Sequence, residues 1–356
     1  MLVYLASTLF AFLLNLLLTF LVIKSALKFG WFDTLNERKI HSGKIPRLGG
    51  VGIFLSTIIT FFLFYLIFNS RLNFFTDKNN SYKLLVFFIS MVTIFLVGLF
   101  DDFNELKARY KLFFQLFVTA LLLLVGFQIP AIQIPFTSFV ITNPIVLKTI
   151  SFFWFIGMMN AVNLIDGMDG LSGGTTLFSI ITIAVIALFY ENTLIAYLAF
   201  IIAASLLAFL CYNLPPAKTF MGDCGSLFLG YILATLPLLE DFKPFSSENW
   251  ILVITIFAAF IPISDTLFAM FRRLIIKHTS FFNPDKEHIH HKLLFLQNNN
   301  TQSVLATIYF ISLIGCGFAA AIFFLPELRS WLTLWALLVF TIIFVLIHKS
   351  FKKATK

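Results

Sequence analysis

Two adjacent carboxylates are the clearest candidates for chemistry in this chain. Asp101 and Asp102 directly follow the apolar stretch 84–100. Acids at the end of an apolar segment are costly unless they pair with cations or bind a metal. Carboxylate oxygens suit Mg²⁺, which usually keeps several waters and bridges to phosphates. A helix-end acid pair neutralised by Lys107 or Arg109 is the alternative.

A second polar group recurs every three residues at the end of another apolar stretch. Asn160, Asn163, Asp166 and Asp169 have the spacing of neighbours on one helix face, and two glycines interrupt the series. Because no Lys or Arg lies in this segment, its carboxylates need a metal or a donor-rich ligand such as a nucleobase or a sugar. A polar helix cap is the alternative.

Segment 215–226 places an acid in a glycine-rich turn before an apolar run. Asp223 stands between Gly222 and Gly225. Backbone N–H groups at such a helix start can face a phosphate, while the carboxylate holds a cation and the nearby Phe220 stacks on a base. A capping Asp is the alternative.

Histidines and cations complete the candidate set. His288, His290 and His291 fall within four positions, without the i, i+4 spacing of a helical zinc pair, so phosphate binding or acid–base chemistry is favoured over zinc. Arg272 follows Asp265 by about two helical turns and should face the same way. Near the N-terminus, His41, Lys44 and Arg47 suit phosphate contacts or anionic lipid headgroups.

The composition identifies what must position these residues. Hydrophobic residues make up 60% of the 356 residues and charged residues 12%, which excludes an ordinary soluble enzyme, a disordered chain and a disulfide scaffold. Strands of a membrane β-barrel would alternate polar and apolar residues. We therefore predict an all-α polytopic membrane protein of about 11 spans, at about 2–23, 50–68, 84–100, 112–127, 147–159, 176–190, 193–212, 227–239, 251–271, 304–325 and 331–347.

The distribution of charge predicts the orientation. With these spans, 19 of the 25 Lys and Arg residues lie on the side of the C-terminus, so the positive-inside rule places the C-terminus in the cytoplasm and the N-terminus outside. All six histidines share that side. This asymmetry accounts for the net charge of +8 without nucleic-acid binding. We expect one membrane domain, 1–348, with five cytoplasmic active-site loops, and a basic tail, 349–356.

Five motifs in this order resemble a known family. The chain is similar to the polyprenyl-phosphate N-acetylhexosamine-1-phosphate transferases (glycosyltransferase family 4), and most to their bacterial undecaprenyl-phosphate N-acetylglucosaminyl-phosphate branch. The matching strings are R-K-I-H…I-P-R-L-G-G (38–50), G-L-F-D-D (98–102), N-A-V-N-L-I-D-G-M-D-G-L (160–171), F-M-G-D-C-G-S (220–226) and H-I-H-H (288–291).

The resemblance implies a reaction and a location. A UDP-N-acetylhexosamine, most simply UDP-N-acetylglucosamine, gives its sugar-1-phosphate to undecaprenyl phosphate, and UMP leaves. The cofactor is Mg²⁺, with Mn²⁺ as a substitute. The enzyme sits in the bacterial cytoplasmic membrane with its site facing the cytoplasm, and it starts a cell-envelope polysaccharide such as cell-wall polymer, lipopolysaccharide or O-antigen.

The resemblance also implies roles for individual residues. The implied catalytic residues are Asp101, Asp102, Asp223 and His288, with Asp223 and Asp102 as metal ligands. The implied nucleotide- or sugar-binding residues are Asn160, Asn163, Asp166, Asp169, Phe220, Arg272, His290 and His291. The implied lipid-phosphate contacts are His41, Lys44 and Arg47. Two departures stand out: Glu105 occupies the place of a third Asp in the family's acidic motif, and Thr34–Leu35 stands where many relatives carry a proline.

Several alternatives stay open at this stage. A sibling branch would use another UDP-N-acetylhexosamine or UDP-N-acetylmuramoyl-pentapeptide. A transporter is the alternative from another class, although transporters place ionisable groups near the bilayer midplane. The lipid phosphate attacks directly, which we favour, or an aspartate forms a covalent intermediate. A homodimer is compatible with the sequence.

Overall fold

The structure is a computed structural model that describes residues 2–32, 45–72, 78–239, 248–273 and 288–354. Within these residues it is nearly all helical. The α-helices are α1 (Leu2–Phe29), α2 (Gly49–Leu72), α3 (Lys78–Asn104), α4 (Ala108–Leu124), α5 (Pro144–Ile165), α6 (Leu171–Phe189), α7 (Thr193–Asn213), α8 (Gly222–Thr235), α9 (Ile251–Ala258), α10 (Phe260–Phe271), α11 (Ile289–Leu296), α12 (Thr301–Phe324) and α13 (Arg329–Ala354).

The helices support a multi-pass membrane architecture. Among the described residues, eight are long and apolar enough to cross a membrane, and α9 with α10, bent by 86°, would make a ninth. Each of the eleven predicted apolar runs falls on one helix or on that bent pair. The count of eleven is not confirmed, because α4 and α8 have only 17 and 14 residues, fewer than the roughly 20 of a typical span.

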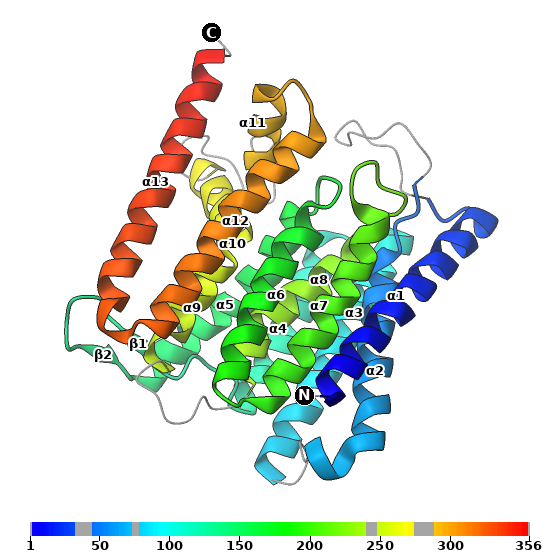
Figure 1. The fold of residues 1–356 in the computed structure, drawn as a ribbon, viewed down its shortest axis with the longest axis horizontal. Helices are drawn as coiled ribbons and strands as arrows, with labels where there is room; N and C mark the ends of the chain where they lie inside the picture. Colours follow the sequence, from blue (N-terminus) through cyan, green and yellow to red (C-terminus); the bar gives the residue numbers. More distant parts are fainter. Residues whose placement is uncertain (1, 33–44, 73–77, 240–247, 274–287, 355–356) are drawn as a thin grey trace.

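One short helix lies at the centre of the bundle. Every residue of α8 is buried, and α8 packs against α3, α5 and α2. Around this centre, α7 packs between α1 and α6, while α12 packs on α6 and α9. Figure 1 shows α1 beginning at the lower end of the bundle and α13 ending at the upper end, near α11.

Small residues and a buried amide hold α1 against α7 and α2. Asn15 of α1 donates from its side-chain amide to the carbonyl of Ser205 in α7, and Thr19 donates to the Asn15 side-chain oxygen at 2.9 Å. A Cβ at Gly52 of α2 would lie 2.5 Å from that same oxygen. In an apolar bundle, such hydrogen bonds and close contacts replace the hydrophobic drive for helix association. They hold α1, α2 and α7 together.

Asparagines begin three of the helices. Asn143, which precedes Pro144 at the first position of α5, accepts hydrogen bonds from the backbone N–H groups of Ile145 and Val146. Asn192 and Asn300 cap α7 and α12 in the same way. Each side chain satisfies donors that the first helical turn leaves without partners.

A two-stranded hairpin departs from the all-α prediction. Strand β1 (Ile132–Gln133) pairs antiparallel with β2 (Val140–Ile141). The backbone N–H of Phe136 donates to the Ser330 hydroxyl at 3.0 Å, and the rings of Phe136 and Trp331 pack edge to face. The hairpin therefore closes against the start of α13, at the opposite end of α5 from the 160–170 motif.

A glycine lets α3 touch the first turn of α8. A Cβ at Gly98 would lie 2.5 Å from the carbonyl oxygen of Asp223 and 2.6 Å from the Cα of Cys224. Backbone atoms cannot yield to such a contact, so only glycine allows this approach. Gly50 of α2 makes the equivalent contact with Gly225.

We expect Gly98→Ala to lower the free energy of unfolding by about 1–3 kcal/mol, the usual cost of overpacking a tight core. Gly157→Ala is the matched control, because a Cβ at Gly157 meets nothing within 4 Å. Thermal unfolding in detergent measures both variants. Equal melting temperatures for the two variants would contradict the close approach of α3 and α8.

Candidate functional site

Asp102 of α3 caps the buried helix α8. Its carboxylate accepts hydrogen bonds from the backbone N–H groups of Asp223 at 2.8 Å and Cys224 at 3.0 Å. Gly222, with φ of +76°, makes the turn into α8, and a Cβ there would lie 2.5 Å from an Asp102 oxygen. The fully buried carboxylate of Asp102 therefore faces the positive end of the α8 dipole and satisfies two N–H groups that the helix itself leaves without a partner.

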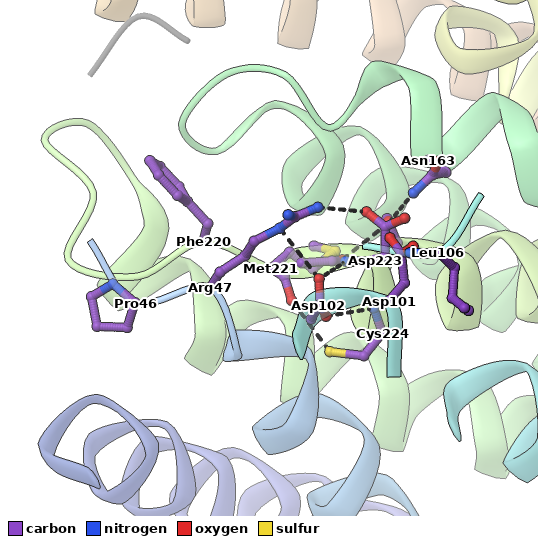
Figure 2. A network of polar contacts seen from close by, with 12 residues as sticks. Pro46, Arg47, Asp101, Asp102, Leu106, Asn163, Phe220, Met221, Asp223 and Cys224 are labelled. Carbon is purple, nitrogen blue, oxygen red and sulfur yellow. Dashed lines mark hydrogen bonds and ion pairs between the residues drawn. The ribbon is translucent and has the colours of Figure 1, made fainter. Parts of the chain in front are cut away.

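Two motifs far apart in the sequence lie side by side at this cap. The backbone N–H groups of Gly49 and Gly50 donate to the carbonyls of Phe220 and Met221 at 2.9 and 2.8 Å, and Phe220 N–H donates to Pro46 at 2.8 Å. This pairing brings Arg47 to the start of α8. Figure 2 shows the Arg47 side chain extending past Asp102 toward Asp223, while the Phe220 ring points away from the carboxylates.

Two cations form ion pairs with the three carboxylates. Arg47 pairs with Asp102 at 3.2 Å and with Asp223 at 2.9 Å. Lys111 of α4 places its Nζ 3.0 Å from Asp101 and 2.8 Å from Asp223. If every acid is ionised, the five side chains carry a formal charge of −1, so the cluster retains affinity for a further cation or for a more highly charged replacement.

Asp101 is held by its own helix end. One oxygen accepts the backbone N–H of Leu106 at 2.7 Å, and the other accepts Lys111. Glu105, whose φ is +44°, directly follows the last residue of α3. It lines a cavity with Arg47 and Asp102.

The arrangement fits a cation at Asp223 better than at Asp102. Lys111 Nζ lies between single oxygens of Asp101 and Asp223, where a dication shared by two carboxylates would sit. Both Asp102 oxygens are already engaged by N–H groups of α8. Within the described ranges, no group of three or more His, Cys, Asp and Glu side chains is arranged to hold a metal.

The asparagine series faces the cluster through α4 and α8. Asn163 donates to the Ser226 hydroxyl at 2.9 Å, and Asn160 donates to the side-chain oxygen of Gln115 at 2.9 Å. Gln115 lies one turn after Lys111 on α4. Asp166 is the C-cap of α5. The predicted ladder therefore exists as far as the end of α5, and its first two members bond to protein partners.

Asp169 and Gly170 tie two loops together. An Asp169 oxygen accepts the backbone N–H of Ala217 at 2.9 Å, which links loop 166–170 to loop 214–221. Gly170, with φ of +73°, donates to the Asn213 side chain at 3.0 Å, and its carbonyl accepts the Tyr309 hydroxyl at 2.7 Å. One Asp169 oxygen is thus structural, and Tyr309 of α12 supports the loop.

The histidines form a second polar cluster. His288 and Asp265 of α10 are both buried, with His288 Nδ1 2.8 Å from the Asp265 carboxylate. His290 packs over Gly167, where a Cβ would lie 3.1 Å from its Nε2. The rings of His290 and His291 lie 4.2 Å apart. This cluster therefore abuts loop 166–170.

Burial makes His290 a neutral residue. Its side chain is 2% exposed, and Nδ1 has no hydrogen-bond partner in the described structure. Loss of hydration, followed by repulsion from His291, lowers the pKa of His290 from 6.5 to about 3.

A cavity of about 270 Å³ opens beside Arg47 and Asp102. Its walls include Trp31, Phe32 and Phe103, together with Gly30, Leu48 and Glu105. The Trp31 ring packs against Phe103 edge to face at 5.5 Å. An apolar wall beside a guanidinium suits a ligand with a phosphate on a hydrocarbon chain.

These contacts place most of the predicted site residues but do not test their roles. His41 and Lys44 lie outside the described residues. Arg272 is the C-cap of α10 and is half-buried. The catalytic, metal-binding and substrate-binding roles predicted from the sequence all stay predictions.

Three residues in these clusters were not singled out as site residues from the sequence. Lys111 and Gln115 are an i, i+4 polar pair in an apolar helix. This spacing could have identified them, but Lys111 was considered only as one of the cytoplasmic charges. Asp265 is a lone acid within an apolar run, and such intramembrane acids usually have a functional partner. Its partner, His288, lies 23 residues away.

The comparisons with known proteins agree with these motifs. The family model described as glycosyl transferase family 4 matches residues 84–240. The probable undecaprenyl-phosphate N-acetylglucosaminyl 1-phosphate transferase of Bacillus subtilis is 33% identical over 349 residues, covering 96% of this chain and 92% of that protein. The undecaprenyl-phosphate alpha-N-acetylglucosaminyl 1-phosphate transferase of Thermotoga maritima is 32% identical over 279 residues, 78% of each chain.

A relative from a sibling branch matches less of this chain. The phospho-N-acetylmuramoyl-pentapeptide-transferase of Staphylococcus carnosus is 29% identical over 275 residues, 72% of this chain and 80% of that protein.

We expect Lys111→Met to lower the free energy of unfolding by about 1–3 kcal/mol, between the values for exposed and for fully buried ion pairs. The variant leaves Asp101 and Asp223 without their shared cation. Arg109→Met is the control, because Arg109 is exposed and its side chain donates to the hydroxyl of the neighbouring Tyr110. Chemical unfolding in detergent would contradict the role of Lys111 if the two variants were equally stable.

The low pKa of His290 predicts acid lability. Because the folded value, about 3, lies below the ordinary 6.5, the unfolded chain binds more protons between these pH values. The contribution of His290 to the free energy of unfolding is therefore fully present above about pH 6.5 and is lost as the pH falls toward 3. We expect His290→Gln to flatten the dependence of melting temperature on pH, whereas His348→Gln, at an exposed position of α13, leaves it unchanged. Parallel curves for His290→Gln and the wild type would refute this assignment.

Proposed function

The chain belongs to glycosyl transferase family 4, and we propose that it transfers N-acetylglucosamine-1-phosphate from its UDP-sugar to undecaprenyl phosphate, releasing UMP. The observation that carries this proposal is the cluster of Arg47, Lys111 and three aspartates at the start of α8, in a chain 33% identical to a protein named for that reaction.

The cluster has the electrostatics that the reaction needs. Donor and acceptor are both phosphate anions, so their approach requires fixed positive charge. Arg47 and Lys111 supply this positive charge beside the start of α8, where their contacts with Asp223 hold them. In this proposal Asp102 positions the helix start.

We propose Mg²⁺ as the cofactor, held chiefly by Asp223 with Asp101 beside it, and with Mn²⁺ as a substitute. Bound there, the ion would neutralise charge on the diphosphate. Lys111 now contacts both of these carboxylates. Its ammonium group is therefore placed to move toward a substrate phosphate when a dication takes its position.

We propose that the acceptor lipid reaches the site through the cavity beside Arg47. A polyprenyl phosphate needs an apolar path for its first isoprene units and a cation for its head. Trp31, Phe32 and Phe103 supply the path, and Arg47 supplies the cation. His41 and Lys44 are further contacts in this proposal, from the same loop.

In this proposal the donor lies on the other side, beside loop 166–170 and the histidines. A lipid phosphate oxygen attacks the phosphorus next to the sugar, the bond to the UMP oxygen breaks, and UMP departs with its electron pair. Direct attack is favoured because Asp101 already accepts Leu106 N–H and Lys111, which leaves it a poor nucleophile. The charge asymmetry of the sequence supports a cytoplasmic location for this site in the bacterial inner membrane.

The test is UMP release from purified protein supplied with undecaprenyl phosphate, Mg²⁺ and UDP-N-acetylglucosamine. We expect release that requires the lipid, is abolished by EDTA, and falls at least about 10²-fold in Asp223→Asn, since this change removes charge stabilisation at the reacting phosphates. Glu327→Gln, which alters an exposed acid between α12 and α13, should keep wild-type activity.

Each other outcome has a definite meaning. Turnover only with another UDP-hexosamine, or with UDP-N-acetylmuramoyl-pentapeptide, would retain the mechanism and change the donor. Activity that survives both EDTA and Asp223→Asn would remove the cofactor proposal. No turnover with any nucleotide sugar, from folded protein, would overturn the proposed function and favour transport.

A further inference from the structure

A buried carboxylate outside the main cluster has two precise contacts. Asp265 of α10 is 5% exposed. One of its oxygens lies 2.8 Å from His288 Nδ1, and the other accepts the backbone N–H of Ile289 at 2.8 Å. Asp265 thus engages both the histidine at the N-cap of α11 and the first residue of that helix.

The contact with His288 determines which ring nitrogen carries the proton. An ionised carboxylate only accepts hydrogen bonds, so Nδ1 must carry a proton. In the neutral ring, Nε2 is then left as a lone pair. When the ring is protonated, Nε2 becomes a donor and the carboxylate stabilises the charge. Asp265 therefore fixes both the orientation and the tautomer of His288.

The location connects this pair to the proposed donor site. The ring of His288 lies 5.8 Å from that of His290, nearly parallel to it, and His290 packs over Gly167. Loop 166–170 is the segment assigned above to the nucleotide sugar. A histidine held beside that loop, with a fixed tautomer, is suited to a single contact with the sugar phosphate.

We propose that Asp265 is a positioning residue that acts through His288, holding its Nε2 toward the donor substrate. This inference rests on the proposed function for its kinetic consequence, although the tautomer itself can be measured without turnover. Asp265 touches no reacting atom. Its effect on the reaction should therefore disappear when His288 is absent.

A purely structural role as a helix cap is the alternative, and two variants separate the roles. In Asp265→Asn the amide oxygen can still accept Ile289 N–H, but the NH₂ group then faces Nδ1 and forces the proton to Nε2. Asp265→Ala removes both the acceptor for Ile289 N–H and the contact with Nδ1. A loss of activity shared by the two variants therefore comes from His288, and a loss confined to Asp265→Ala comes from the cap.

The first readout is the tautomer. Nitrogen NMR of protein labelled with ¹⁵N-histidine, with the His288 signals assigned from His288→Gln, should show a proton on Nδ1 in the wild type. The proton should move to Nε2 in Asp265→Asn. A wild-type His288 protonated only on Nε2 would overturn the proposal, whatever the activity of the protein.

The second readout is a double-mutant cycle on UMP release. We expect Asp265→Asn to lower kcat about 10²-fold with little change in KM for the UDP-sugar, because a misplaced tautomer harms the transition state more than binding. Combined with His288→Gln, it should cost nothing further. Full and independent losses from the two changes would overturn positioning through His288 and leave the cap. Asp265→Ala should lower the melting temperature more than Asp265→Asn does, because only the Ala variant loses the acceptor for Ile289 N–H.

The two proposals fail in different ways. A wild type that releases no UMP from any nucleotide sugar refutes the proposed function, and the NMR result then decides the geometry of Asp265 and His288 alone. A wild type that is active, with a kcat unchanged in Asp265→Asn, refutes the positioning role and leaves the proposed function intact.

Discussion

The capping of α8 by Asp102 is the interaction on which the rest of the site depends. A helix that begins inside an apolar bundle exposes N–H groups that no water can satisfy, and leaving them without partners is costly. Asp102 reaches them from α3 only because Gly98 brings that helix into backbone contact with Asp223. Asp223 in turn starts the helix with its carboxylate facing outward to Arg47 and Lys111.

Charge balance then dictates the neighbours of the cap. Three carboxylates close together in a medium of low polarity repel one another strongly. The fold therefore needs Arg47 and Lys111 to balance this charge, whatever their role in function. The side chains of Arg47 and Lys111 are 25% and 24% exposed, so a ligand can reach them. In the proposed reaction, a phosphate substrate would take over contacts of these cations, and a dication would take the place of Lys111 between Asp101 and Asp223.

The C-terminal end of α5 lies between the two polar clusters. Its Asn163 bonds to Ser226 of α8, and the loop that follows it meets His290 over Gly167. The histidine cluster depends on Asp265 in the bent pair α9–α10, as the carboxylate cluster depends on α8. Both polar sites are therefore built on short or bent helices.

The sequence by itself determined the helical membrane class, the order of the apolar runs and the motifs that carry Asp101, Asp102, Asp223 and the histidines, because these follow from local composition and spacing. Only the tertiary structure decided the partners. Asp102 holds a helix start, Lys111 joins two acids, Asp169 bonds to Ala217, and Asp265 holds His288. These contacts join residues up to 121 positions apart, and no local pattern specifies which buried group will satisfy another.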